Sequence, residues 1–370
     1  MPKIYDRNCN QCGKHYIGLG VKYCSKKCSA NASLKQRDAP KTESIIEKHQ
    51  ERQQQKKDNA HVGQLLRHIE VLKRELEIVK DFQPIQTHTI THDKAFGQNE
   101  STAVVQLADW HIEEEVKSST INNLNKYNLE IAQQRAHECF ARIVSLTRMY
   151  QKDTTIKNLV IQLGGDMITG NIHADNIESS LLRPMEALIM AEELICSGIE
   201  FLLNHTRLDI TIVCNMGNHP RITKQVHRAN ESGNSLEMYM YYHIAKHLSK
   251  HARIKFVIPD SALAYINIYN VKIRMLHGHQ VRYGGGVGGV LIPLRKKINI
   301  WDQAIPSDIT LVNHFHQQHN TKRIVMNGSM IGYNKFALDL GFEYEEPCQN
   351  YFLIHAKKGK TIYSPILFAV

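Results

Sequence analysis

Residues 102–111 read TAVVQLADWH, an apolar, β-branched run that ends in Asp109 and His111. The same arrangement recurs in NLVIQLGGD at residues 158–166 and in DITIVCNMGNH at residues 209–219. Short apolar runs of this kind predict buried strands. Polar side chains that directly follow such strands meet at one edge of an open α/β sheet, where these folds place their chemistry. The three stretches therefore predict an α/β sheet with a functional site at the carboxyl ends of its strands.

Two histidine motifs, His277-Gly278-His279 and Asn313-His314-Phe315-His316, complete the set of polar side chains. Carboxylates, an amide and imidazoles, with no thiolate among them, suit divalent ions such as Mn, Fe or Zn without choosing among these metals. Two ions about 3.5–4 Å apart form an established device for cutting phosphate esters. We therefore expect a dinuclear metal site in which the two ions share one carboxylate.

In this order the motifs resemble the calcineurin-like metallophosphoesterase superfamily, and its SbcD-type DNA nuclease branch most of all. The resemblance covers roughly residues 102–330. It implies that one ion is held by Asp109, His111, Asp166 and His316, and the second by Asp166, Asn218, His277 and His314. It also implies that His219 contacts the phosphate and donates a proton to the leaving group. Mn²⁺ is the expected metal, with Fe, Zn, Ni and Mg as alternatives.

The chain departs from the family pattern at three places. Asn313 replaces the usual glycine before His314, Pro220 follows His219, and Ile112 follows His111. The first departure bears on the backbone that aims His314, whereas the other two concern the rim of the site. Because the chain has 21 histidines, some pairs arise by chance. The family pattern favours His277 over its neighbour as the ligand, and three further histidines are either substrate contacts or surface residues: His173, His279 and His319.

The order of the expected elements predicts an α/β fold of two packed sheets flanked by helices, the sandwich of this superfamily. Helices are expected near residues 128–150, 177–205, 235–250 and up to 304. Strands are expected near residues 102–108, 158–163, 209–215, 253–258, 263–269, 271–276, 309–313, 323–326, 350–356 and 361–368.

A second metal motif lies near the start of the chain. Cys9-Asn-Gln-Cys12 and Cys24-Ser-Lys-Lys-Cys28 form two short cysteine pairs separated by eleven residues. Four thiolates at this spacing close a tetrahedral zinc site. The segment resembles the treble-clef zinc fingers of DNA-processing enzymes, so one structural Zn²⁺ is expected. Disulfides are the alternative, but the other cysteines are scattered singly in apolar contexts, as in a reducing compartment: Cys139, Cys196, Cys214 and Cys348.

Three domains are expected: a zinc finger at 1–37, a charged linker with an amphipathic helix at 38–100, and a metallophosphoesterase domain at 101–370. Within the linker, apolar residues at 62–81 follow a seam that fits a short coiled coil: Leu65, Ile69, Leu72, Leu76 and Val79. This helix either forms a homodimer or packs against the catalytic domain, and the sequence leaves both alternatives open.

The net charge of +10 is concentrated in residues 1–60, which hold 13 Lys and Arg against 6 Asp and Glu. A basic module on a nearly balanced enzyme indicates a nucleic-acid partner. The finger's cations favour phosphate contact over protein docking: Lys14, Lys22, Lys26, Lys27, Lys35 and Arg37. With no long apolar run and no signal-like segment, we expect no membrane partner and a cytoplasmic location, the host cytoplasm if the protein is viral.

These features predict a phosphodiesterase, and first of all a DNA nuclease. Cationic and imidazole side chains after Asn218 are candidate substrate contacts beside His279: Arg221, Lys224, His227 and Arg228. The Gly-rich segment 284–289 either approaches a phosphate or forms a plain turn. One alternative function is a phosphomonoesterase or cyclic-nucleotide phosphodiesterase whose finger docks a protein. Another is a DNA-bound scaffold, which the complete ligand set disfavours. No partner ATPase can be identified from the sequence.

Overall fold

The computed structural model describes residues 4–19, 22–34, 53–54, 87–92, 99–282 and 289–368. The chain divides into two compact units, Met1–Ile85 and Gln86–Val370. The predicted helix at 62–81, most of the predicted linker, and Lys35 and Arg37 lie outside the described residues, as does the Gly-rich segment up to residue 288.

The first unit contains a small antiparallel hairpin. It pairs β1 (Tyr5–Asn8) with β2 (His15–Gly18), and residues 26–34 that follow are helical. The hairpin turn carries Cys9 and Cys12, and the helical segment carries Cys28. The first cysteine pair therefore lies at the hairpin turn, and the second lies at the start of the helical segment.

The second unit contains a seven-stranded sheet. Four of its strands are parallel neighbours: β4 (Glu100–Leu107), β5 (Thr155–Leu163), β6 (Asp209–Cys214) and β7 (Ile254–Val257). Antiparallel strands extend the β4 side: β13 (Cys348–His355), β14 (Gly359–Tyr363) and β15 (Ile366–Leu367). Because the four central strands run in one direction, their carboxyl ends form one edge.

A six-stranded sheet forms the second layer, in the order β11-β12-β10-β9-β8-β3. Its strands are β3 (His88–Ile90), β8 (Ala264–Ile268), β9 (Val271–Met275), β10 (Ile309–Val312), β11 (His319–Asn320) and β12 (Ile324–Met326). β9 and β10 are parallel, so the residues that follow them also share an edge.

The alternation of apolar side chains along β4 explains the layers. Val104 packs in one core with Ile266 and Leu311 of the other sheet, whereas Val105 and Leu107 pack in a second core with the helices. Successive side chains on a strand point to opposite faces, so each strand serves both cores. The predicted fold class is confirmed: a two-sheet α/β sandwich flanked by helices.

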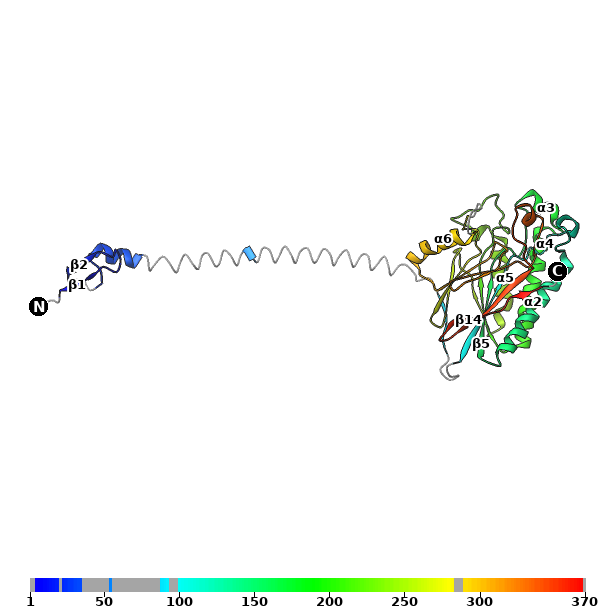
Figure 1. The fold of residues 1–370 in the computed structure, drawn as a ribbon, viewed down its shortest axis with the longest axis horizontal. Helices are drawn as coiled ribbons and strands as arrows, with labels where there is room; N and C mark the ends of the chain where they lie inside the picture. Colours follow the sequence, from blue (N-terminus) through cyan, green and yellow to red (C-terminus); the bar gives the residue numbers. More distant parts are fainter. Residues whose placement is uncertain are drawn as a thin grey trace. The chain divides into compact units, whose positions relative to one another are not determined.

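Helices cover both outer faces of the sandwich. α2 (Leu129–Tyr150), α4 (Pro184–His205) and α5 (Leu236–His247) contribute to the core on the seven-stranded sheet, and α6 (Leu291–Ala304) packs on the six-stranded sheet. Figure 1 shows α2 and α4 on one side of this unit and α6 on the other. No helix among the described residues is long and apolar enough to cross a membrane. Shorter helical elements complete the fold: α3 (Ala174–Ser179), α7 (Lys335–Asp339), η2 (Ser118–Ile121), η3 (Ser232–Asn234) and η4 (Leu248–Lys250).

Three elements differ from the expectation. The single helix expected at 177–205 is two helices, because Pro184 starts α4 at its first position and the Glu186 side chain caps that end by accepting from Arg183 N. The predicted linker at 38–100 contains a strand, β3, which pairs with β8 and so extends the six-stranded sheet. The strand expected at 361–368 is two short strands, β14 and β15.

Arg274 on β9 ties α6 to the six-stranded sheet. Its fully buried guanidinium donates to Asp302 Oδ1 at 2.7 Å and to Ile305 O at 2.6 Å. It also lies over the rings of Tyr265 and Trp301, at 5.5 and 5.6 Å from their centroids. The buried positive charge of Arg274 is stabilised by these hydrogen bonds and ring contacts. Removal of one partner leaves the remaining buried polar groups without that contact.

Arg274→Ala should therefore lower the free energy of unfolding by about 3–5 kcal/mol, measured by urea titration. Arg323 provides a matched control, because it binds the same Asp302 but is 52% exposed in its side chain. Arg323→Ala should cost no more than about 1 kcal/mol. Equal losses in the two variants would contradict a structural role for the buried guanidinium.

Candidate metal centre

The candidate ligands lie at the shared edge of the two sheets. Asp109 follows β4, Asp166 follows β5 and Asn218 follows β6, while His277 follows β9 and His314 follows β10. Polar side chains that follow five strands from both layers thus meet in one place. The structure brings together all seven residues predicted as metal ligands, and it groups their atoms in overlapping sets within 4.8 Å of one another, with Asn218 Oδ1 beside His277.

One set surrounds Asp109. Its Oδ2 accepts from His314 N at 2.9 Å, and its Oδ1 lies 3.5 Å from His316 Nε2. Among the described residues, Asp109 Oδ1 and His111 Nε2 are both buried without a hydrogen-bond partner. Buried polar atoms are nearly always paired, so two of them facing one point indicate a missing cation. Asp109, His111 and His316 therefore fit one metal position.

Asp166 stands between that position and a second one. Its Oδ1 accepts from His219 N at 2.8 Å, and its Oδ2 lies 2.9 Å from His277 Nε2. It belongs both to the set with His111 and His219 and to the set with His277 and His314. This carboxylate is therefore placed to serve two ions, as a bridging ligand must.

The second position is surrounded by His277, Asn218 and His314. His277 Nε2 lies 3.2 Å from both Asn218 Oδ1 and His314 Nδ1. The other ring nitrogen, His277 Nδ1, lies 2.8 Å from Gly164 O, and a carbonyl can only accept, so Nδ1 carries the proton. Nε2 is thereby directed at Asp166 and Asn218. Metal-binding histidines are commonly oriented in this way.

Burial and neighbouring charge adjust the protonation of these groups. Burial lowers the pKa of His111 and of His314 well below the usual range, which leaves both imidazoles neutral, as metal ligation requires. Burial by itself would raise the pKa of Asp166, but the imidazoles of His277 and His219 lower it well below its usual range. Burial by itself would lower the pKa of His277, but Asp166 raises it to about 9. Asp166 and His277 thus form a buried pair in which the carboxylate is ionised and the imidazole is protonated.

The backbone around the ligands is strained. The φ angle is positive at Asp109 (53°), His111 (46°), Asp166 (54°), His314 (76°) and His316 (52°). Non-glycine residues adopt such angles at a cost of roughly 1–3 kcal/mol each, and they do so mainly at functional sites. Neighbouring strands supply the same left-handed turn directly after they end, and this turn directs the side chains back over the sheet edge.

Two glycines allow the ligand loops to approach each other closely. A Cβ on Gly165 would lie 2.5 Å from Gly217 N, and one on Gly217 would collide with Asp166 Oδ1. Gly165 and Gly217 therefore permit a close approach of the two ligand loops that a side chain would prevent.

Glu237 on α5 holds these same two loops together. This fully buried carboxylate accepts from Met167 N at 2.6 Å and from Gly217 N at 2.8 Å. Burial raises its pKa to about 8, with a further contribution from Asp166. Sequence reasoning did not single out Glu237; its only signal is a lone acid within the apolar run LEMYMYYHIA.

Below the ligands, buried carboxamides link the two sheets. Gln106 on β4 donates to Asn313 Oδ1 at 3.2 Å and accepts from Asn350 Nδ2 at 2.9 Å. Gln162 on β5 donates to Asn215 Oδ1 at 2.9 Å, and Asn215 donates to Met275 O on β9 at 3.1 Å. Asn313, which replaces the usual glycine of the motif, is therefore a fully buried member of this network.

The predicted substrate contacts have different surroundings. The guanidinium of Arg221 donates to the carbonyls of Asn218, Thr223 and Lys224, so it organises its own loop. His279 Nε2 contacts Glu231 Oε1 at 2.6 Å, beside His277 and His314. Three side chains of the loop are exposed: Lys224, His227 and Arg228. His173 is also exposed, at the start of α3, and His319 lies on β11.

The four cysteines of the first unit come together as predicted. Their sulfurs lie within 4.8 Å of one another, and Cys24 Sγ is 3.6 Å from the Sγ atoms of Cys12 and Cys28. Sulfurs bound at about 2.3 Å to a tetrahedral zinc would lie roughly 3.8 Å apart. Burial would raise the pKa of Cys9, but backbone N–H groups lower it to about 6, whereas bonds from the other thiols raise that of Cys24 to about 12. The spacing of the four sulfurs therefore fits a metal ion.

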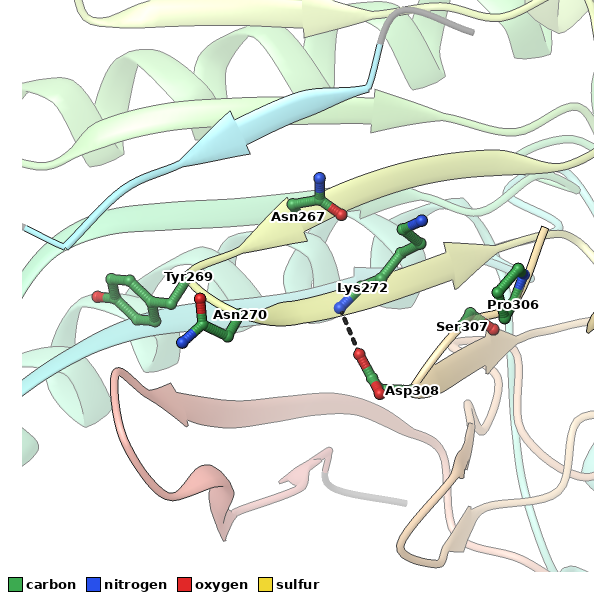
Figure 2. A pocket seen from close by; sticks show the side chains of 7 residues that line it. All are labelled: Asn267, Tyr269, Asn270, Lys272, Pro306, Ser307 and Asp308. Carbon is green, nitrogen blue, oxygen red and sulfur yellow. Dashed lines mark hydrogen bonds between the residues drawn. The ribbon is translucent and has the colours of Figure 1, made fainter. Parts of the chain in front are cut away.

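A cavity of about 400 Å³ in the second unit lies away from the candidate metal centre. Figure 2 shows it at the β8–β9 turn, where Tyr269 and Asn270 lie near Lys272, whose backbone N donates to Asp308 at 2.8 Å. The turn is at the amino end of β9, and His277 follows the opposite end. The cavity is therefore separate from the candidate metal centre.

No protein-family model and no curated protein matches the sequence. Among solved structures, vacuolar protein sorting 29 from Cryptosporidium parvum is 14% identical, with 74% of this chain and 100% of that chain covered at a TM-score of 0.30. A single mutant of Vps29 from Entamoeba histolytica is 13% identical, with 72% and 99% covered at 0.28. The hypothetical protein PH1004 from Pyrococcus horikoshii OT3 is 12% identical, with 72% and 89% covered at 0.36. At such low TM-scores the likenesses carry no argument, and the fold rests on the strand order.

Proposed function

We propose that this chain is a dinuclear metal-dependent phosphodiesterase of the calcineurin-like metallophosphoesterase superfamily that cleaves DNA. The observation that carries the proposal is that Asp109 Oδ1 and His111 Nε2 are buried without a hydrogen-bond partner among the described residues, near Asp166, whose two oxygens contact different residues. A cluster of carboxylates and neutral imidazoles of this kind has the composition of a divalent-metal site. When bound, two ions supply Lewis-acid stabilisation of the phosphate and activate a water.

His219 is the side chain best placed to move a proton. Its Nδ1 lies 2.9 Å from Thr169 O and donates to it, so Nε2 is the nitrogen that gains or loses the second proton. Its ring centroid is 4.8 Å from that of His111. A histidine in this position can protonate a leaving oxygen. No metal is needed to hold it there, because the contacts to Thr169 O and Asp166 come from the protein.

Two groups of cations support DNA as the substrate. Among its described residues, the unit that carries the four clustered cysteines exposes Lys14, Lys22, Lys26 and Lys27. The loop after Asn218 exposes Lys224, His227 and Arg228. Lysine and arginine side chains that neutralise phosphates supply most of the sequence-independent affinity for DNA.

The test is a Mn²⁺-dependent assay on linear, circular and single-stranded DNA, with p-nitrophenyl phosphate and its bis-ester in parallel. We expect cleavage of DNA and of the bis-ester, and none by Asp166→Ala. Hydrolysis of the monoester with DNA left intact would replace the nuclease with a phosphomonoesterase. No hydrolysis of any of these substrates by the metal-loaded protein would overturn the phosphodiesterase itself.

Replacement of Lys14, Lys22, Lys26 and Lys27 with glutamine should weaken DNA binding. Each lost phosphate contact reduces the slope of log K against log salt by about 0.9 on duplex DNA. Fluorescence anisotropy across a salt series measures this change, and bis-ester hydrolysis should stay unchanged. A matched control replaces exposed lysines at the opposite end of the seven-stranded sheet from the metal centre: Lys152, Lys250, Lys357 and Lys358. Equal salt slopes for the two sets would show that the finger does not anchor the DNA.

A further inference from the structure

Thr169 lies between two histidines of the candidate metal centre. Its Oγ1 is 3.0 Å from His111 Nδ1, and its carbonyl oxygen is 2.9 Å from His219 Nδ1. The two rings meet edge to face, with their centroids 4.8 Å apart. Thr169 therefore contacts the Nδ1 atom of both imidazoles, through its hydroxyl in one case and its carbonyl in the other.

The direction of these hydrogen bonds is set by Glu114. Thr169 Oγ1 lies 3.3 Å from Glu114 Oε2, whose carboxylate also accepts from Asn334 Nδ2 at 2.9 Å. Since the carboxylate accepts, the hydroxyl donates its only proton to Glu114. The hydroxyl oxygen then accepts from His111 Nδ1, which must carry the ring proton. The lone pair of His111 is left on Nε2, the buried atom without a hydrogen-bond partner.

Glu113 fixes the backbone of Thr169. Its Oε1 accepts from Thr169 N and from Gly170 N, both at 2.8 Å. Gly170 has a φ of 64°, and a Cβ there would lie 2.8 Å from His219 O. Thr169 is itself fully buried. Neither its hydroxyl nor its carbonyl can move without displacing the loop that carries His219.

We propose that Thr169 is a positioning residue that fixes the ring orientations of both His111 and His219. The hydroxyl orients the metal ligand and the carbonyl orients the proton donor, so the two are aligned by one rigid link. The inference rests on the proposed dinuclear site, and it adds a residue that none of the five sequence motifs contains. Partners that orient a ligating histidine typically change metal affinity by about 10–100-fold when lost.

Thr169→Val tests the hydroxyl, because it removes the oxygen while it keeps the backbone carbonyl and the branched shape. Calorimetric titration of the full chain with Mn²⁺ should show that one of two ions binds about 10–100-fold more weakly, with the other unchanged. Thr169→Ser restores the hydroxyl and should bind both ions nearly as the wild type does. In long-range ¹H–¹⁵N spectra of the metal-free protein, the fixed Nδ1–H tautomer of His111 should become mixed in Thr169→Val only.

Thr147→Val is the matched control. This threonine is also buried, and its hydroxyl is 3.2 Å from Tyr351 OH, far along α2 from the ligands. It should leave both Mn²⁺ affinities unchanged. Wild-type affinities in Thr169→Val, or equal losses in Thr169→Val, Thr169→Ser and Thr147→Val, would overturn the inference.

The readout also separates this inference from the proposed function. A wild-type chain that binds two ions but leaves DNA intact would refute the nuclease and leave the role of Thr169 standing. A wild-type chain that binds fewer than two ions would refute both.

Discussion

Asp166→Asn should reduce kcat/KM for bis-ester hydrolysis by roughly 10³-fold or more, since even one lost electrostatic contact to a developing charge costs about 10²–10³-fold. The reason is geometric. Asp166 belongs to two ligand groups, one shared with His111 and one with His277, and its two oxygens contact different residues. Asparagine offers a single oxygen and no charge, so it can serve one ion at most. Elemental analysis of the Mn²⁺-loaded variant should find that at least one ion is lost.

Asp209→Asn is the control for this substitution. Asp209 is an exposed carboxylate at the amino end of β6, at the opposite end of the sheet from Asp166. It should keep full activity and both ions. An Asp166→Asn variant that binds two ions and keeps an unchanged rate would contradict the bridging assignment. The melting temperature of this variant without metal, compared with that of the wild type, establishes that its fold is intact.

His219→Asn should slow turnover by about 10²–10⁴-fold while both ions stay bound, because removal of a general acid affects the proton transfer and not the metal ligands. The main contacts of His219 are its N–H to Asp166 and its Nδ1 to Thr169 O. The backbone contact survives the substitution. Rates for a bis-ester with a leaving group that needs no proton should fall much less than rates for DNA.

His227→Asn provides the comparison, since His227 is an exposed imidazole on the loop that follows His219. It should leave the turnover of the bis-ester unchanged. If His219→Asn loses metal in proportion to its activity, His219 is a ligand and not the proton donor.

The parts of this molecule that the sequence predicts well are local. Apolar runs such as TAVVQLA predict the strands, and the strand ends place Asp109, Asp166 and Asn218 at one edge because parallel strands share a direction. The two-sheet sandwich was predicted and is confirmed. The structure brings the predicted ligands together, and their role as ligands stays a prediction that metal titration can test.

The parts that sequence reasoning did not reach depend on distant contacts. Glu237 lies 70 residues from Met167, whose N–H it accepts, and nothing in either segment indicates the pairing. β3 was assigned to a connector because three residues are too few for a periodic signal, and only its pairing with β8 makes it a strand. Thr169 carries no motif, and its role arises from the loop that Glu113 folds around it.

The carboxamides between the sheets determine how far the metal centre can deform. Two sheets in contact through aliphatic side chains alone could slide, because apolar attraction has no preferred direction. Gln106 and Asn350 resist such shear, since their hydrogen bonds to Asn313 Oδ1 and Met326 O cross the layers and fail when the partners are displaced. Asp109 and Asp166 follow strands of the seven-stranded sheet, and His277 and His314 follow strands of the six-stranded sheet. If two cations bind, their spacing would therefore be set by the buried interior of the sandwich.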